Sequence, residues 1–197
     1  MISVKDLNIL IAGVGGQGTL LASRFLGTAA VLMGKDVKLS EVHGMSQRGG
    51  SVITCVKIGT SIHSPLIAEG EADVILSFEQ VEAVRWLPYL KKGGTVITNT
   101  QKIESMPVIS GKAEYPDNVL SVLQASDVKL IWLDALSIAE SCGSAKAVNT
   151  VLLGVLASQL KEVAPSIWEQ CLETVIPAKV LEINKKAFAE GLKEVSC

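Results

Sequence analysis

The chain has little of what several classes of protein depend on. Its four cysteines lie far apart, at Cys55, Cys142, Cys171 and Cys197. No two of them have the close spacing of a zinc or iron–sulfur motif, which excludes a site of that kind within this chain. Aromatic residues make up only 4% of the sequence and the formal net charge is -2. Neither a base-stacking platform nor an electrostatic surface for nucleic acid is therefore expected.

Long apolar runs are also missing. The first apolar run, at residues 8–12, is short and is broken at once by Gly13, unlike the apolar core of a secretory signal. No stretch reaches the ~18 apolar residues of a membrane-spanning helix. Widely spaced thiols agree with a reducing compartment. We therefore expect a cytoplasmic protein without a membrane segment.

Charged residues are scarce as well, at 19% against 48% apolar residues, and the mean hydropathy is +0.39. These values predict a surface that another chain covers, although a core rich in small residues explains part of them. The length of 197 residues is enough for one sizeable core, and no linker interrupts it. Residues 1–197 are therefore predicted to form a single domain.

The first third of the chain has the pattern of a strand, a helix and a second strand. Residues 8–12 form a continuous apolar run that suits a buried strand. Helical spacing follows from Gly18 to Gly34, and residues 36–40 read as a second strand. Such a unit favours a parallel sheet. Residues 51–59 form another strand with no helix before it, which predicts a hairpin or antiparallel element, paired with residues 61–63.

Strands and helices then alternate. We expect strands at residues 72–77, 95–99 and 129–134, with helices between them at 79–90 and 118–125. Three more helices are expected at 145–161, 166–173 and 178–190. The predicted fold class is α/β: a Rossmann-like open, mostly parallel sheet with a hairpin or antiparallel element after the second strand and a helical C-terminal part.

A glycine loop lies between the first strand and the first helix. Residues 13–18 match the pattern G-x-G-x-x-G, in which the glycines permit a tight turn, a close phosphate and close helix packing. The amides of the first helical turn then point at the anion. A phosphate or nucleotide site is therefore predicted, with a purely structural glycine turn as the alternative. Its residues are Gly13, Gly15, Gly16, Gln17, Gly18 and Thr19.

An NAD site would need an acid at the end of the second strand, and Glu41 stands there. The residues that follow it are unusual for a dehydrogenase. Arg48 is a bidentate donor suited to phosphate or carboxylate, and His43 is of the one residue type whose ordinary charge change falls near neutral pH. The predicted second loop therefore favours an anion site, formed by Glu41, Arg48, Gly49, Gly50 and Ser51.

Three polar residues outside these loops have structural interpretations. Glu79 and Asp134 each precede a predicted helix, so we interpret them as helix N-terminal residues, with ligand contact as the alternative for Asp134. Asn149 lies on a helix face of small residues, where a contact with a partner chain is favoured over catalysis.

The two loops together resemble the gamma-type domain of 2-oxoacid:ferredoxin oxidoreductases. The motif residues are 13–19 and 41–51, and within the family they are most similar to the beta subunits of indolepyruvate ferredoxin oxidoreductases. Residues 64–67, 70–73 and 177–188 resemble that family too. The resemblance extends from Leu7 to Gly191.

The resemblance implies an oxidative decarboxylation. An aryl-2-oxoacid such as indolepyruvate reacts with coenzyme A to give the aryl-acetyl-CoA and carbon dioxide, and two electrons pass to ferredoxin. In that family thiamine diphosphate, Mg and the 4Fe-4S clusters belong to a larger partner subunit. This chain agrees, since it has neither a cysteine cluster nor a Gly-Asp-Gly segment followed by a metal-ligating Asn. We therefore expect no metal on this chain and no activity without its partner.

The family's gamma-type domain lies against the thiamine site, which implies that both loops bind coenzyme A phosphates or close the site over substrate. The alternative is that the loops form the interface, with Arg48 paired to a carboxylate of the partner. His43 is the one catalytic candidate, and a structural hydrogen bond is the simpler role for it. Other open functions are a subunit for pyruvate, 2-oxoglutarate or a branched-chain 2-oxoacid, a free-standing NAD-binding dehydrogenase, and a non-catalytic assembly subunit.

Overall fold

The computed structural model describes residues 2–42 and 50–194. Six strands form one sheet in the order β2-β3-β1-β4-β5-β6. Strands β1, β4, β5 and β6 are parallel, whereas β3 is antiparallel to both of its neighbours. The predicted fold class is confirmed. The strands are β1 (Leu7–Val14), β2 (Asp36–Val42), β3 (Ser51–Gly59), β4 (Ala72–Ser77), β5 (Leu90–Asn99) and β6 (Lys129–Leu133).

The antiparallel strand β3 lies inside the sheet, between β1 and β2. It pairs with β1 from Leu7–Ile58 to Val14–Ser51 and with β2 on its other side. One expectation was wrong in detail, because residues 61–63 form no strand with β3. The first two strands run parallel, but β3 lies between them. The nine-residue run of β3 is β-branched and apolar on both faces, so it is stabilised better inside the sheet than in a short exposed hairpin.

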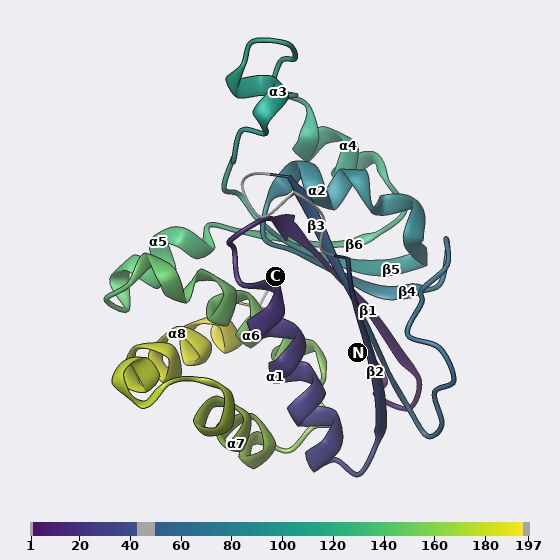
Figure 1. The fold of residues 1–197 in the computed structure, drawn as a ribbon, viewed down its shortest axis with the longest axis vertical. Helices are drawn as coiled ribbons and strands as arrows, with labels where there is room; N and C mark the ends of the chain where they lie inside the picture. Colours follow the sequence, from purple (N-terminus) through teal and green to yellow (C-terminus); the bar gives the residue numbers. More distant parts are fainter. Residues whose placement is uncertain (1, 43–49, 195–197) are drawn as a thin grey trace.

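Helices cover both faces of the sheet (Figure 1). One layer holds the long helices, and side chains of alternate strand residues such as Ile9 and Ile11 face it. The other layer is thinner, and Leu10 and Ala12 face it. The first layer consists of α1 (Thr19–Leu32), α5 (Ala135–Ser141), α6 (Val148–Gln159), α7 (Pro165–Val175) and α8 (Leu181–Lys193), and the second of α2 (Gln80–Arg85) and α4 (Val119–Ala125).

Some predicted boundaries shift for identifiable reasons. The helix expected at 79–90 ends at Arg85, because Pro88 follows and residues 87–89 form a 3-10 turn, η2 (Leu87–Tyr89). The strand expected at 95–99 begins earlier, at Leu90, so Gly93 and Gly94 lie within β5. The helices expected at 145–161 and 178–190 each begin with a 3-10 turn, η3 (Ala145–Ala147) and η4 (Ala178–Val180). One short helix was not predicted, α3 (Met106–Ile109), and the helix expected after Asp134 is α5.

Helices α6 and α8 approach each other closely at two glycines. A Cβ atom on Gly154 would lie 2.3 Å from the carbonyl oxygen of Phe188, and one on Gly191 would lie 2.1 Å from that of Val151. Any side chain at these positions would push the helix backbones apart. The contact therefore requires glycine on both helices.

In the part of the chain that the structure describes, no helix has both the length and the apolar character needed to cross a lipid bilayer.

Candidate functional site

The glycine loop lies at the carboxyl end of β1, where open α/β sheets bind ligands. Its shape is fixed by the side chain of Gln17. The Gln17 Oε1 atom accepts a hydrogen bond from the amide of Val14 at 2.7 Å, and Nε2 donates to the carbonyl of Phe78 at 3.0 Å. Gln17 thus ties the loop to the end of the neighbouring strand β4.

The first turn of α1 presents its amides without a competing side chain. Gly18 precedes the helix with a φ of 85°, and no side chain caps the helix. No acidic residue stands in the first turn either. The partial positive charge of the helix N-terminus is therefore available to an anion, as the sequence pattern predicts.

Gly18 is required by a neighbour that the sequence did not indicate. A Cβ atom at Gly18 would lie 2.4 Å from Nδ2 of Asn149, at the start of α6. The close packing at this glycine is therefore against the α6 side chain. Asn149 itself is only 8% exposed, and its Oδ1 atom accepts a hydrogen bond from the Thr150 hydroxyl at 3.3 Å. The contact with a partner chain that the sequence favoured stays a prediction.

The second loop meets the glycine loop directly. The amide of Gly15 donates to the carbonyl of Gly50 at 3.1 Å. Ser51, the next residue, donates from its hydroxyl to the Glu82 carboxylate. The structure therefore brings together Gly15, Gly50 and Ser51 as expected from their motifs. His43, Arg48 and Gly49 lie outside the described residues.

Glu41 lies at the outer side of the sheet, on the edge strand β2. Its Oε1 atom accepts a hydrogen bond from the hydroxyl of Ser23 on α1 at 2.9 Å. Strand β3 separates β2 from β1, so Glu41 does not stand next to the glycine loop as the acid of an NAD site does. This strand order disfavours the NAD-binding alternative.

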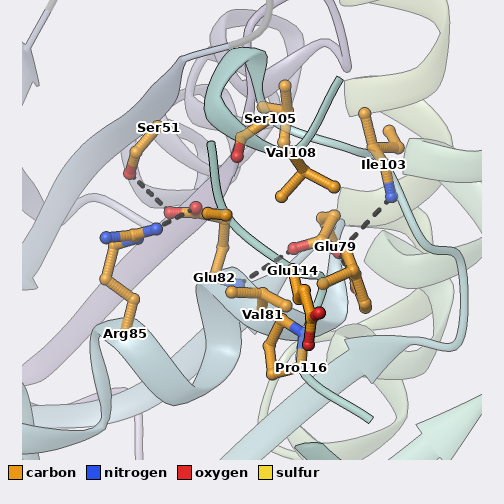
Figure 2. Close-up of a pocket in the computed structure, with 13 residues that line it drawn as sticks. Ser51, Glu79, Val81, Glu82, Arg85, Ile103, Ser105, Val108, Glu114 and Pro116 are labelled. Atoms are coloured by element: carbon orange, nitrogen blue, oxygen red, sulfur yellow. Dashed lines mark hydrogen bonds and ion pairs between the residues drawn. The ribbon is translucent and has the colours of Figure 1, made fainter. Parts of the chain in front are cut away.

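A pocket of about 370 Å³ opens beside the two loops, between α2 and residues 103–116. Figure 2 shows Ser51 and Arg85 converging on the Glu82 carboxylate, with Val81, Val108 and Pro116 among the apolar walls. The lining comes from the carboxyl ends of β1 and β4, the first residue of β3 and the connection after β5. Its residues are Val14, Ser51, Glu79, Val81, Glu82, Arg85, Ile103, Ser105, Val108, Ala113, Glu114, Tyr115 and Pro116.

Glu79 forms the base of this pocket and is only 1% exposed. It caps α2 by accepting from the amide of Glu82 at 3.0 Å, and its other oxygen accepts from the Tyr115 hydroxyl and from the Ile103 amide at 3.5 Å. Burial raises the pKa of the Glu79 carboxyl, which the Tyr115 hydrogen bond opposes. Burial, and then the same hydrogen bond, raises the pKa of Tyr115. One carboxylate thus holds both ends of the segment 103–115.

The family model of pyruvate ferredoxin/flavodoxin oxidoreductase matches residues 8–194. The chain belongs to this family. It is 42% identical over 196 residues to the indolepyruvate oxidoreductase subunit IorB of Thermococcus kodakarensis, covering 96% of each chain. It is 28% identical over 195 residues to the common subunit gamma of the pyruvate/ketoisovalerate oxidoreductases of Thermococcus litoralis, covering 95% of this chain and 96% of that protein.

Solved structures of the oxidoreductase family have the same fold. The gamma subunit of the keto/oxoacid ferredoxin oxidoreductase from Geobacter sulfurreducens superimposes with a TM-score of 0.72 at 21% identity, covering 95% of this chain and 97% of that one. The 2-oxoglutarate:ferredoxin oxidoreductase from Magnetococcus marinus, solved with 2-oxoglutarate, coenzyme A and succinyl-CoA bound, gives 0.73 at 21% identity. There the match covers 96% of this chain but 31% of the larger one. The resemblance found in the two loops is confirmed at the level of the family.

The described cysteines, histidine and carboxylates of this oxidoreductase subunit lie apart from one another. In residues 2–42 and 50–194, no group of three or more His, Cys, Asp or Glu side chains is placed to hold a metal ion. Cys55 and Cys171 are buried in separate elements, β3 and α7. Burial raises the pKa of the Cys171 thiol to about 11 and also raises that of Cys55. Both therefore behave as apolar core residues.

Two helix-capping expectations are confirmed, whereas one cluster of interacting side chains in the pocket was not predicted. Glu79 caps α2, and Asp134 caps α5 by accepting from the amide of Ser137 at 3.0 Å. Sequence reasoning did not find the pair of Glu82 and Arg85, nor its contact with Ser51. Their spacing of three residues on a helix is a weak signal, because it is also common on solvated faces.

Proposed function

We propose that this chain is the subunit of an indolepyruvate ferredoxin oxidoreductase that holds neither thiamine diphosphate nor iron–sulfur clusters. It would work as a single domain in the cytoplasm, bound to a larger subunit that carries thiamine diphosphate, Mg and 4Fe-4S clusters. The observation that carries the proposal is the identity to the indolepyruvate oxidoreductase subunits over almost the whole of both chains. The identity to the pyruvate/ketoisovalerate subunits is clearly lower.

The proposed reaction breaks the bond between the carboxylate and the oxo carbon of an aryl-2-oxoacid. Carbon dioxide leaves, the acyl carbon forms a thioester with the sulfur of coenzyme A, and the thiol proton is released. Two electrons are removed from the substrate and reduce two ferredoxins by one electron each. The partner's thiamine diphosphate supplies the carbanion chemistry when bound. This chain's residues bind and orient the coenzyme A.

The two loops would hold the phosphates of coenzyme A. The uncapped first turn of α1 offers amides, Gly15 and Gly50 join the loops, and Arg48 adds a fixed positive charge. The proposed contacts are Gly13, Gly15, Gly16, Gln17, Gly18, Thr19, Arg48, Gly49, Gly50 and Ser51. Glu41 would contribute indirectly: it accepts a hydrogen bond from the Ser23 hydroxyl and so orients α1. His43 remains the candidate for a proton-transferring group.

The first experiment tests the assembly and its substrate. The chain is expressed with its thiamine-bearing partner, and the purified complex is assayed for ferredoxin reduction with coenzyme A and different 2-oxoacids. Indolepyruvate should give the highest kcat/KM. A preference for pyruvate, 2-oxoglutarate or a branched-chain 2-oxoacid would assign the chain to another branch of its family. Saturable NAD(H) binding with redox turnover by the chain alone would overturn the subunit assignment.

The second experiment tests the role of the loops. In the assembled complex, Arg48→Ala should raise the KM for coenzyme A by about tenfold, the usual effect of losing a charge-assisted hydrogen bond. The KM for the 2-oxoacid should change little. If the variant leaves both KM and turnover unchanged but prevents the subunits from co-purifying at low concentration, the loop is interface structure.

A further inference from the structure

The pocket between α2 and residues 103–116 is joined to both loops. Val14, the last residue of β1 before the glycine turn, lines it. Ser51 lines it as well, directly after Gly50, whose carbonyl accepts the Gly15 amide. If a ligand binds with its phosphates at the two loops, the part of the ligand next to those phosphates therefore lies at the mouth of this pocket.

The pocket has the composition of a site for a flat, uncharged ring. Its walls are mostly aliphatic, and the buried polar groups at its base are the hydrogen-bond acceptors Glu79 and Glu82. A carboxylate offers about four lone-pair sites. Among the described residues, Glu79 Oε2 accepts a hydrogen bond from the Glu82 amide, and Glu82 Oε1 accepts one from Arg85 Nε. The remaining lone pairs of the two carboxylates can accept hydrogen bonds from a ring that carries N–H donors, as adenine does on its exocyclic amine.

Arg85 is held at the mouth of the pocket. Its Nε atom lies 3.0 Å from Glu82 Oε1, and the Arg85 side chain is 52% exposed whereas that of Glu82 is 6% exposed. The buried carboxylate is fixed in turn by the Ser51 hydroxyl and by the indole Nε1 of Trp86, at 3.3 Å. The terminal amino groups of Arg85 have no acceptor in the part of the chain described by the structure. Their planar fork matches a phosphate.

We propose that this pocket receives the adenine end of coenzyme A and that Arg85 binds the 3′-phosphate of its ribose. The inference rests on the proposed function, because it assumes that the two loops hold the pyrophosphate of the same molecule. Arg85 then makes the subunit selective for coenzyme A over dephospho-coenzyme A, which lacks only that phosphate. Glu82 is a positioning residue that fixes the guanidinium.

The test compares coenzyme A with dephospho-coenzyme A in the assembled complex. Arg85→Ala should raise the KM for coenzyme A by about tenfold and leave that for dephospho-coenzyme A nearly unchanged, since it removes a charge-assisted contact to one phosphate only. Arg85→Lys, which keeps the charge but not the fork, should restore part of the difference. Equal KM effects on the two acceptors, or no effect on either, would overturn the role of Arg85.

Val108→Trp tests the ring site separately. The side chain of Val108 lines the pocket from the segment outside the sheet, so the larger ring should fill the pocket without disturbing the core. It should raise the KM for both acceptors by a similar factor. Lys92→Ala is the control, because Lys92 is an exposed cation at the opposite end of β5, and it should change neither KM. An unchanged KM in Val108→Trp would overturn the ring site.

The glycine loop separates a failure of this inference from a failure of the proposed function. If Gln17→Ala raises the KM for coenzyme A while Arg85→Ala and Val108→Trp do not, the loops bind the coenzyme and the pocket does not. If none of the three variants changes that KM, coenzyme A does not bind this subunit and the proposed role of the loops is wrong too.

Discussion

The two faces of the sheet differ in what fills the space beneath their helices. Under α1, α6, α7 and α8 the contacts are mostly apolar, and Phe25, Trp168 and Phe188 pack ring against ring. The buried polar side chains on these helices are uncharged, such as Thr150 and Asn184, which share a hydrogen bond. Under α2 and the segment that follows β5, the buried groups include the carboxylates Glu79 and Glu82. The first face has the composition of a stabilising core, whereas the second includes buried charges at a cost in stability.

This difference would let one sheet serve both stability and the proposed binding of coenzyme A. Charges that are buried and still hydrogen-bonded keep side chains such as Arg85 in one geometry. The layer of α1, α6, α7 and α8 supplies apolar burial that offsets the cost of desolvating these buried charges. Variants in that layer should therefore lower the free energy of unfolding, and variants on the pocket side should mainly change ligand binding.

The largest effect is expected at Phe25. It is fully buried, and its ring stacks on Trp168 with a centroid distance of 5.8 Å. Phe25→Ala should lower the free energy of unfolding by about 4 kcal/mol, because it removes a buried ring and leaves a cavity. Leu120→Ala, on the partly exposed side of α4, should cost less than about 0.5 kcal/mol. Urea unfolding followed by circular dichroism measures the free energy of unfolding of both variants. A similar decrease in the two would contradict the proposal that one helical layer contributes more to stability than the other.

The next effect is expected where α6 crosses α8. Gly154→Ala should lower the free energy of unfolding by about 3 kcal/mol, because the new methyl group meets the Phe188 carbonyl. Gly27→Ala is the matched control on α1, where a Cβ would meet only Leu39 Cδ1 at 3.5 Å. That variant should be neutral or stabilising by up to about 1 kcal/mol, since alanine favours a helix interior over glycine. Thermal and urea unfolding of both variants test this pair, and a stable Gly154→Ala protein would contradict the close crossing.

A smaller effect on stability is expected at Gln17, together with a larger one on binding. Gln17→Ala leaves the Val14 amide and the Phe78 carbonyl without their partner, which should cost about 1–2 kcal/mol. The loosened loop should also raise the KM for coenzyme A in the assembled complex. Ser121→Ala is a control for losing one exposed hydrogen bond, from the Ser121 hydroxyl to the Asn118 carbonyl. A Gln17→Ala variant that loses stability but keeps its KM would place Gln17 with the purely structural residues.

The smallest effect is a pH dependence at Glu79. Because burial raises its pKa above the ordinary value of 4.5, the folded chain binds this proton more tightly than the unfolded chain. The resulting stabilisation is fully present below pH 4.5 and is lost as the pH rises through the folded pKa. Glu79→Gln removes the titration, so the stability of the natural chain relative to this variant should fall as the pH rises.

Urea unfolding at a series of pH values measures that difference. Glu114→Gln, which changes an exposed carboxyl on the same pocket wall, corrects for the loss of one charge. A difference between natural chain and Glu79→Gln that rises with pH would mean that the hydrogen bond from Tyr115, rather than burial, controls the Glu79 carboxyl.

Much of the local structure could be predicted because its signals are local. The strand at residues 51–59 and the strand at 72–77 were found with their observed bounds, since β-branched and apolar runs between turn residues favour strands. The extent of the helix before Pro88 was misjudged and the short α3 was missed, because tertiary contacts decide whether such marginal segments are helical. The role of Asp134 was found, since an acid before a helix is a local capping signal.

The sequence by itself determined the glycine loop, the second loop and the family, because these depend on residue types at fixed spacings. Only the tertiary structure decided the strand order, since pairing β3 between β1 and β2 joins residues far apart in the chain. It also assembled Ser51, Glu82 and Arg85 into one group from a strand and a helix 31 positions apart. No local pattern encodes such a group, because its geometry exists only after the sheet and α2 have packed together.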